Sequence, residues 1–596
     1  MKKAVLRTTL ILMLAGILTI LAACADGGVQ TPASGAQTPD GETTDGSGCV
    51  HQYVFEGFEW KSADEADAVY VCQKDASHIS RRRAEVTTGV LSEATSVKTG
   101  VKRSVAREGG REETREMTYM APEVTLTVYS VNDFHGAVSA DDSQTGLGRF
   151  ASFFKAKGED GNTLLVDVGD TWQGSILSNY NSGRMICDVY NYVGFDAKVV
   201  GNHDFDWGPE VLEENAAFTS YGRKTPFLAA NVYDFDFQTK KQGRIQQEQF
   251  GAKSVTYTMA SGLKVGIVGL IGEDQITSIN SLYTQDICFT DHVKVIKEEA
   301  RALRSAGCDV VICAIHAAQD EVLGKRLGDY VDLVLCAHSH QLEHTYEGDL
   351  LFAQFRSNGE YFGEITLTFD TEKKRATSAL KNLSAADVAR ETPFADLELL
   401  ALIDRYGEEC RAEAGVVVAN NVKNSFSSPE LPDLMCRAMY DACRKAGYDV
   451  CLTYVNKGRK RLSAGTWTYE DLYEAFPFDD LVYIAEVTGR EILDQIGNYN
   501  YMYRSPEMED GIDPDATYLI GVADYLLFHT DTARRFNYFP KSAANVRGLL
   551  NDNYRVILRD WLLENGYADG KELSAADFGD SLRQHDRNAF YEKPQN

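Results

Sequence analysis

The sequence lacks an excess of positive charge. Its 596 residues include 60 lysines and arginines against 88 aspartates and glutamates, which gives a formal net charge of −28 at pH 7. Proteins that bind nucleic acids usually carry a basic face, so this balance argues against binding to a nucleic-acid polymer. It also argues against attraction of an anionic ligand by the whole molecule. Such a ligand would have to be attracted by local cations.

The sequence has a long apolar run near its start, and a second one is missing. Beyond residue 24 no stretch is apolar enough to cross a bilayer, so we expect the rest of the chain to be soluble and outside the cytoplasmic membrane. Residues 1–24 are typical of a targeting segment, in which a basic start precedes the apolar run from Leu10 to Ala23. The run ends in Leu-Ala-Ala-Cys and resembles the lipobox of bacterial lipoproteins. The resemblance implies lipidation of Cys24 and a membrane anchor, with a plain signal peptide or a short membrane anchor as the alternatives.

Cys-x-x-Cys spacing, a common sign of thiolate metal sites, is missing from the 12 cysteines. We interpret those in apolar runs, such as Cys313 and Cys336, as buried thiols. Residues 49–98 differ, because Cys and His occur together there in a small unit rich in aromatic residues. The pattern predicts a small β module with a spacer or attachment role. Two hypotheses stay open, a zinc site or a disulfide between the two cysteines; the residues concerned are Cys49, His51, Cys72 and His78.

The length of the chain indicates three or four folded units. Residues 25–48 have little to bury and predict a disordered tether, and residues 99–121 are charged and predict a linker. The remaining boundaries place a catalytic domain at 122–385, a helical connector at 386–413, a second α/β domain at 414–578 and a tail at 579–596.

Polar residues follow five apolar, strand-like runs of the central region. The blocks are Asn132-Asp133-x-His135-Gly136, Gly169-Asp170, Gly201-Asn202-His203-Asp204-x-Asp206, His316 and His338-Ser339-His340. The runs alternate with helical stretches, as in layered α/β folds, whose ligand-binding groups lie at the carboxyl ends of strands. Carboxylate and imidazole groups without thiolates favour Zn, Mn or similar ions. Because the set is too large for one ion, it predicts two divalent metal ions.

In order and spacing, these blocks resemble the metallophosphoesterase domain of the 5′-nucleotidase/UDP-sugar hydrolase family. The resemblance implies a β-sandwich flanked by helices, followed by a smaller α/β domain. It also implies two metal sites that share a bridging Asp170, a catalytic dyad, and water as the nucleophile. One metal would be held by Asp133, His135 and His340, and the other by Asn202, His316 and His338; the dyad would be His203 and Asp206.

The second α/β domain resembles the substrate-binding domain of the same family. The matching blocks are Asn456-x-Gly458-x-x-Arg461, Pro477-Phe478 and Asp524-Tyr525 through Asp531. The resemblance implies that Asn456, Gly458 and Arg461 contact the substrate, that Phe478 and Tyr525 stack on a base, and that Asp531 binds the sugar.

Three departures weaken this second match. Arg459 replaces a second glycine, Phe528 to Thr530 replace the glycines before Asp531, and Ser428-Pro429-Glu430 lacks a phosphate-binding arginine. Arg459 could supply that missing charge.

The sequence therefore predicts a lipid-anchored, extracytoplasmic two-metal phosphohydrolase, with 5′-nucleotidase as the first hypothesis. The alternatives within the class are 2′,3′-cyclic nucleotide phosphodiesterase and UDP-sugar hydrolase. A nucleotide-binding or adhesive surface lipoprotein without turnover is the alternative of another class, and the complete ligand set argues against it.

Overall fold

The structure is a computed structural model, and it divides into two compact units. One unit holds the N-terminal residues up to Gly89 together with Arg103–Glu116, and the other holds Val90–Lys102 and Met117–Asn596. In the described residues no helix is long and apolar enough to span a membrane. The described residues are 42–44, 50–141, 143–236, 241–242, 251–280, 282–284, 287–495, 501–504, 512–528, 530–531, 536–537, 539 and 545–578. The predicted lipidation residue Cys24 and the predicted tail at 579–596 lie outside this set.

The N-terminal unit contains a four-stranded antiparallel sheet in the order β1-β2-β3-β4. Its strands are β1 (Glu42–Thr44), β2 (Val50–Ser62), β3 (Glu65–Cys72) and β4 (Ile79–Arg83). The buried cluster of this unit has six residues, and four of them are alanines. The small core agrees with the predicted β module, although β1 lies in the segment predicted to be a tether.

Strands also occupy most of residues 99–121, for which the sequence predicts a linker. β6 (Gly100–Glu108) and β7 (Arg111–Tyr119) form a three-stranded sheet with β5 (Glu85–Ser92). Their charges pair between the strands, as in Arg103 with Glu116 at 2.6 Å and Arg107 with Glu112 at 2.7 Å. Opposite charges on facing strands stabilise a sheet, so a charged segment of this kind need not be a linker.

Two six-stranded sheets form the centre of the larger unit. The first has the order β11-β10-β9-β8-β21-β22 and the second β14-β15-β17-β18-β20-β19. Their inner faces share one buried cluster, to which β8 contributes Leu126 and β17 contributes Ile312. The strands of the first sheet are β8 (Glu123–Val131), β9 (Thr163–Asp167), β10 (Ala197–Val199), β11 (Phe227–Leu228), β21 (Tyr361–Asp370) and β22 (Arg375–Ser384). Those of the second are β14 (Ser254–Thr258), β15 (Lys264–Ile271), β17 (Val310–His316), β18 (Leu333–Leu335), β19 (Leu342–Glu347) and β20 (Leu350–Phe355).

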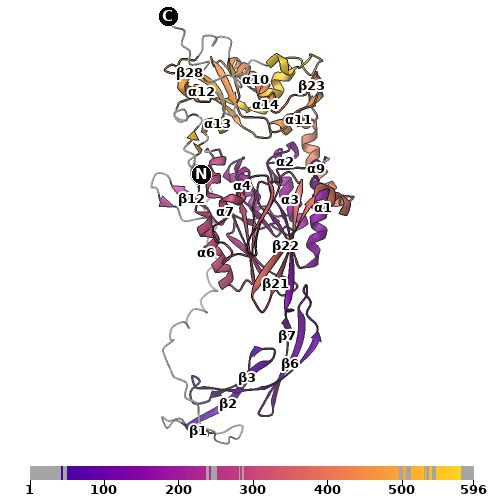
Figure 1. Cartoon of the computed structure of the whole chain (residues 1–596), viewed down its shortest axis with the longest axis vertical. Coiled ribbons are helices and arrows are strands. Elements are labelled where there is room, and N and C mark those ends of the chain that lie inside the picture. Colours follow the sequence, from indigo (N-terminus) through magenta and orange to yellow (C-terminus); the bar gives the residue numbers. More distant parts are fainter. Residues whose placement is uncertain are drawn as a thin grey trace, which may run out of the picture. The chain divides into compact units, whose positions relative to one another are not determined.

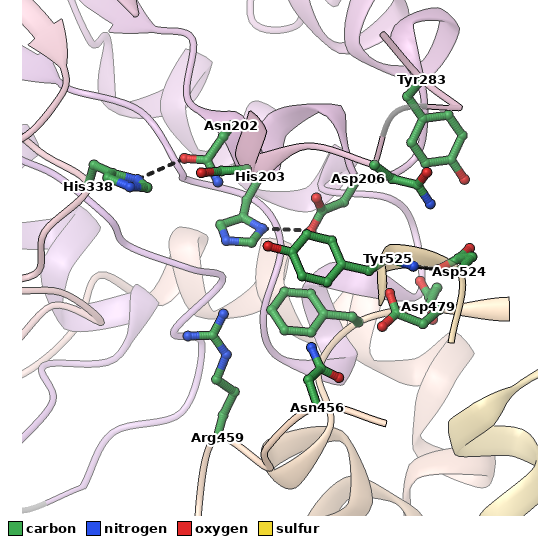
Figure 2. Close-up of a pocket in the computed structure, with 14 residues that line it drawn as sticks. Asn202, His203, Asp206, Tyr283, His338, Asn456, Arg459, Asp479, Asp524 and Tyr525 are labelled. Atoms are coloured by element: carbon green, nitrogen blue, oxygen red, sulfur yellow. Dashed lines mark hydrogen bonds and ion pairs between the residues drawn. The ribbon is translucent and has the colours of Figure 1, made fainter. Parts of the chain in front are cut away.

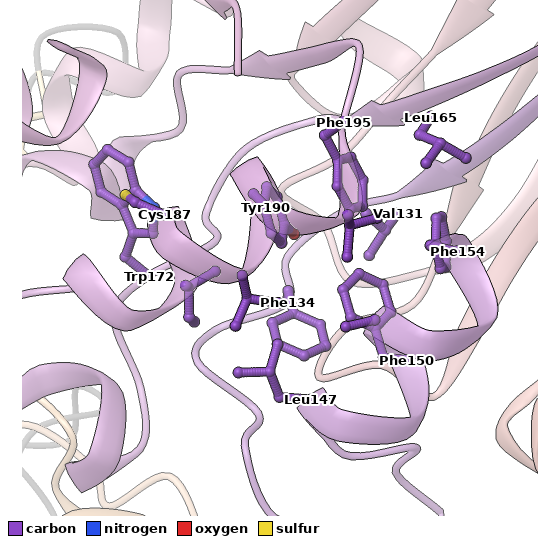
Figure 3. Close-up of a cluster of buried hydrophobic side chains, with 14 of the residues drawn as sticks. Val131, Phe134, Leu147, Phe150, Phe154, Leu165, Trp172, Cys187, Tyr190 and Phe195 are labelled. Atoms are coloured by element: carbon purple, nitrogen blue, oxygen red, sulfur yellow. The ribbon is translucent and has the colours of Figure 1, made fainter. Parts of the chain in front are cut away.

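Helices cover the outer faces of this sandwich. α1 (Leu147–Lys157) and α3 (Arg184–Val193) lie on one side and α6 (His292–Ser305) on the other (Figure 1). α1 and α3 contribute side chains to a dense, buried aromatic cluster, in which Phe150 and Tyr190 lie near Phe195 (Figure 3). Strands such as β17 are buried at every position, because parallel strands between two layers have no solvent-facing side. These features confirm the predicted layered α/β fold.

A smaller α/β part follows two helices, α8 (Ala385–Glu391) and α9 (Leu397–Ala414). Its five-stranded sheet has the order β27-β24-β28-β26-β31. This part has two buried clusters. The first includes residues of α10 (Leu431–Lys445) and α14 (Tyr554–Glu564). The second includes residues of α12 (Gly489–Gln495) and α13 (Asp524–Phe528). The strands are β24 (Leu452–Val455), β26 (Leu481–Thr488), β27 (Tyr501–Arg504), β28 (Thr517–Ala523) and β31 (Val546–Asn553).

Candidate active site

The predicted metal ligands follow strands of both central sheets. Asp133 comes after β8, Asp170 after β9 and Asn202 after β10, while His316 ends β17 and His338 follows β18. Because these strands are parallel neighbours within their sheets, their carboxyl ends open on the same edge of the sandwich. The fold therefore brings together residues that are more than 200 positions apart in the sequence.

One ligand group consists of Asp133, His135 and His340. Their ligand atoms all lie within 4.8 Å of one another. The Nε2 atoms of His135 and His340 are 3.2 Å apart, and His340 Nε2 lies 3.3 Å from Asp133 Oδ1. This is the group that the sequence predicts for one metal ion.

A second group consists of Asp170, His316 and His338, again within 4.8 Å. The Asn202 side-chain oxygen lies 3.1 Å from His316 Nε2 and 3.0 Å from His338 Nδ1 (Figure 2). Asp170 Oδ2 is 3.2 Å from His316 Nε2 and 4.0 Å from His135 Nε2. Asp170 therefore lies between the two groups, where the resemblance predicts a bridging carboxylate.

The backbone at these positions is strained. Five candidate ligands have a positive φ, which non-glycine residues rarely adopt, and such strain of about 1–3 kcal/mol per residue is concentrated at functional sites. The residues are Asp133 at 50°, His135 at 49°, Asp170 at 54°, His338 at 73° and His340 at 56°. Tight turns at the strand ends therefore hold these side chains in place at an energetic cost that packing alone does not require.

Neighbouring groups orient the imidazole rings and leave little room for substitution. His316 Nδ1 lies 2.8 Å from the Val168 carbonyl, and His135 Nδ1 lies 3.2 Å from the Gln173 carbonyl. Such contacts hold a ring so that its other nitrogen faces a metal ion. Gly201 packs against Asp170 so closely that any Cβ atom would collide with it.

The charge states of the ligands fit two divalent cations. Burial alone would raise the pKa of Asp133 and Asp170, but the adjacent histidines lower it, so both carboxylates are ionised. Burial lowers the pKa of His135 to about 3 and that of His338 to about 4, so both rings are neutral, the form that binds metal. Burial would also lower the pKa of His316, but Asp170 raises it to about 9, so His316 must lose a proton when it binds a metal ion. Clustered buried carboxylates and neutral imidazoles of this kind are the donor set of Zn or Mn sites.

His203 and Asp206 form the predicted pair beside the metal ligands. His203 Nδ1 lies 2.9 Å from Asp206 Oδ2 (Figure 2). Burial lowers the pKa of His203, but the carboxylates of Asp206 and Asp170 outweigh burial and raise it above its usual value. The backbone N–H of His203 also donates to Asp170 Oδ1 at 2.8 Å. An imidazole whose pKa favours the protonated form is thereby fixed next to the carboxylate that lies between the two ligand groups.

A buried ion pair supports the loop that carries His203, and the sequence reading did not identify it. Lys198 Nζ lies 2.7 Å from Asp204 Oδ2, and the same oxygen accepts a hydrogen bond from Gly201 N. Asp204 Oδ1 also accepts a long one, 3.4 Å, from Thr171 N. The signal in the sequence was a lysine in an otherwise apolar run directly before the loop, since a buried lysine needs a partner.

A cavity of about 250 Å³ extends from the metal ligands to the smaller α/β part (Figure 2). It contains Asn202, His203 and His338 from the first part and Asn456, Phe478 and Tyr525 from the second. It also contains residues that the sequence reading missed, namely Ser278, Asn280, Tyr283, Asp479, Asp480 and Asp524. We call Asp479, Asp480 and Asp524 the acidic wall.

A second cavity of about 460 Å³ adjoins the first, and His203, Arg459 and Phe478 line both. This cavity reaches His135 and His340 and also includes Lys460. Arg459 therefore places its charge beside the metal ligands, and its guanidinium lies 4.9 Å from the centroid of the Phe478 ring.

The other predicted substrate contacts are placed differently. Arg461 is exposed and lines neither cavity. Gly458 is buried, and its carbonyl accepts a hydrogen bond from Ser428 Oγ. Asp531 lies in a two-residue strand, β29 (Thr530–Asp531), and its side chain lies outside the described residues.

The loop with Phe478 is held from both sides. The Pro477 carbonyl accepts hydrogen bonds from Gln173 Nε2 at 2.7 Å and Asn179 Nδ2 at 2.8 Å. From the other side, the buried Arg555 donates to the Phe478 carbonyl at 2.7 Å and to the Asp479 carboxylate. The Phe478 ring stacks on His203, with ring centroids 5.3 Å apart. The predicted base-stacking ring therefore touches the predicted catalytic histidine.

The acidic wall carries less charge than its three carboxyl groups imply. Asp479 is paired with Arg555. Burial, with Asp524 nearby, raises the pKa of Asp480 well above its usual value, and burial raises that of Asp524 to about 6. Burial therefore favours the protonated form of Asp480, in which the carboxyl group can donate a hydrogen bond.

Residues 411–510 match the family described as "5′-nucleotidase, C-terminal domain". The chain is 25% identical to an apyrase from Tabanus yao over 421 residues, which cover 62% of this chain and 73% of the apyrase. It is 23% identical to the endonuclease YhcR of Bacillus subtilis (strain 168) over 465 residues, 68% of this chain but only 37% of that protein. The fold is similar to the crystal structure of a 5′-nucleotidase precursor from Thermus thermophilus, with a TM-score of 0.62 at 20% identity, covering 75% of this chain and 97% of the other.

The fold and the two ligand groups define a metal-dependent phosphoric ester hydrolase of the metallophosphoesterase class. Within that class, the chain is similar to members of the 5′-nucleotidase family, whose C-terminal domain model matches residues 411–510.

Proposed function

We propose that this protein is a 5′-nucleotidase, which hydrolyses a nucleoside monophosphate to nucleoside and inorganic phosphate. One observation carries the proposal, namely that a single cavity contains metal-ligand candidates, the His203–Asp206 pair and the two aromatic residues Phe478 and Tyr525. A phosphate at one end and a flat base at the other are what this combination can hold.

The proposed metal ligands are those of the two groups. Asp133, His135 and His340 would hold one divalent ion, and Asn202, His316 and His338 the other, with Asp170 shared. When bound, two divalent ions supply an activated water nucleophile and stabilise the charge that develops on the phosphoryl group. The positive φ angles and the ring contacts keep these side chains in the geometry for binding before any ion arrives.

His203 would act on the leaving group. Its ring is protonated and held by Asp206, so it can donate a proton or positive charge to the sugar oxygen as the bond to phosphorus breaks. Arg459 lies beside the same site and would bind the phosphate. It would thereby replace the arginine that the family pattern places before Glu430. The net charge of the protein makes such local cations necessary.

The acidic wall favours a substrate with one phosphate. A second phosphate inside this cavity would meet the Asp524 carboxylate, whereas ribose hydroxyls or a base amino group could hydrogen bond to Asp480 and Asp524. This favours a nucleoside monophosphate over a UDP-sugar in the pocket.

We also propose an extracytoplasmic location with a lipid anchor at Cys24. The support is the targeting pattern of residues 1–24 alone. Metabolic labelling with a fatty-acid analogue should label the protein and not the Cys24→Ala variant.

The function is tested by phosphate release from purified protein with Zn or Mn. The panel contains nucleoside 5′-monophosphates, 2′,3′-cyclic nucleotides, UDP-sugars and a non-nucleotide ester. The 5′-monophosphates should have the highest kcat/KM. A higher value for another member of the panel would replace the proposed substrate, and no release from any member would support a protein that binds without turnover.

A further inference from the structure

Three side chains of the N-terminal unit emerge from one face of the β2–β3–β4 sheet. Cys72, at the end of β3, pairs with Tyr53 of β2, and its N–H donates to the His78 carbonyl at 3.0 Å. Residues paired across strands share a face, as do residues two apart within one strand. His51 is two residues before Tyr53, so the side chains of His51, Cys72 and His78 all project from this face.

His51 contacts both of the other side chains. The Nδ1 atoms of His51 and His78 lie 3.1 Å apart, and the rings meet edge to face with centroids 4.6 Å apart. The Cys72 sulfur is hydrogen bonded to the His51 side chain. Two imidazole nitrogens on one tetrahedral zinc ion, each about 2.0–2.1 Å from the metal, are about 3.3 Å apart, close to the observed separation.

The surroundings of Cys72 stabilise a thiolate. The sulfur is hydrogen bonded to the backbone of Lys74 and Asp75 and to the His51 side chain. A buried apolar cysteine does not require such donors, whereas a metal-bound sulfur uses them to spread its charge.

The N-terminal unit also has little else to stabilise it. In the described part of this unit, the buried cluster contains two residues larger than alanine, Phe58 and Tyr70, and four larger side chains pack against it while partly exposed, namely Tyr53, Phe55, Trp60 and Val86. Units with so small a core commonly depend on a metal ion or a disulfide.

We propose that His51, Cys72 and His78 bind a structural zinc ion. A thiolate with two imidazoles is a zinc-binding donor set, in contrast to the catalytic groups, which contain carboxylates and imidazoles only. Cys49 lies outside the described residues, and the competing hypothesis is a disulfide between it and Cys72.

Cobalt substitution of the full chain separates this site from the catalytic one. Thiolate bound to Co²⁺ gives a charge-transfer absorption in the near ultraviolet, and no cysteine belongs to the catalytic ligand groups in the described part of the chain. The Co²⁺ form should show the band, and Cys72→Ser should abolish it while lowering the zinc content of the zinc form by one ion per chain. His78→Cys should strengthen the band, because a second thiolate replaces an imidazole.

Cys451→Ser is the matched control, since Cys451 is a half-buried cysteine of the smaller α/β part whose thiol donates to the Leu519 carbonyl. It should leave the band unchanged, and hydrolysis should be the same in Cys72→Ser as in the parent. Absence of the band from the parent chain, its survival in Cys72→Ser, or a Cys49–Cys72 disulfide found by peptide mapping would each overturn the proposal.

Discussion

The cavity that contains the acidic wall reaches the metal-ligand groups through Asn202 and His338, but the two regions are built in different ways. The ligands sit on turns at the ends of buried strands, with strained φ angles and rings oriented by backbone carbonyls. The wall sits on a loop and a short helix of the smaller α/β part, and its Asp479 carboxylate accepts hydrogen bonds from Arg555 and from the ring nitrogen of Trp207. The difference indicates that the first region carries out the chemistry and the second selects the substrate.

The largest effect is expected at the bridging position of the first region. Asp170→Asn removes the charge that lets two cations lie close together, so metal and activity should be lost together. Loss of several kcal/mol of transition-state stabilisation corresponds to a fall in kcat/KM of about 10³-fold. Metal analysis and initial rates on the same sample check this, and full activity with two ions retained would refute the bridging role.

A change at His203 should separate chemistry from metal binding. His203→Asn keeps a polar side chain but offers no proton, so kcat should fall by about 10²–10⁴-fold. The metal content should stay at the parent value. If the ions are lost instead, His203 is a ligand and not an acid. Asp204→Asn provides a useful contrast, because it weakens the support of the loop through Lys198 without touching the His203 ring.

Substitutions of two neighbouring arginines test which of them contacts the substrate between the metal-ligand groups and the smaller α/β part. Arg459→Gln removes a cation that lines both cavities, and KM for a monophosphate should rise about 10-fold or more, as expected for a charged hydrogen bond. Arg461→Gln is the matched control, because Arg461 is exposed and lines neither cavity, so its effect should be within about twofold. The reverse pattern in KM would support the contact that the family resemblance implies for Arg461.

The smallest effect concerns stability at the acidic wall. Asp480 has an unfolded pKa of about 3.9 and a folded pKa well above it, so the folded state binds more protons and stability falls as pH rises through this window. Asp480→Asn removes this penalty and should raise the melting temperature by a few degrees, at about 2–4 °C per kcal/mol. The gain should be larger at about pH 8 than at about pH 5. Asp552→Asn, at an exposed position of the same sheet, should show no such dependence, and an equal gain at both pH values would contradict the assignment.

The sequence was sufficient for the central fold and for the grouping of the candidate metal ligands. Apolar runs that end in Asp, Asn or His predict buried parallel strands and a shared edge, and the structure brings Asp133, Asp170 and His316 together at that edge. The physical reason is that strand geometry alone fixes where such residues point.

The recognition region could be predicted only in part. Phe478, Tyr525 and Asn456 line the cavity, but Asp480 and Asp524 were missed and Arg459 occupies the place expected for Arg461. Loops position these residues through distant partners such as Arg555, and no local pattern reveals those contacts. The charged segment at 99–121 was misjudged for the same reason, because its charges pair across strands.

The central claim is that one region carries out the chemistry and the other selects the substrate. It is tested most directly by comparing two substrates on the variants of the two aromatic residues. Phe478→Ala and Tyr525→Ala remove contacts that a base makes equally in the ground and transition states, at about 1–3 kcal/mol per stacked base. KM for a nucleoside monophosphate should therefore rise about 10-fold or more in both variants, while hydrolysis of a small aryl phosphate, which has no base, should barely change in Tyr525→Ala. Phe478 also stacks on His203, so Phe478→Ala should lower aryl phosphate hydrolysis in part. A parallel loss on both substrates would show that the rings support the fold or the chemistry, and would contradict the account.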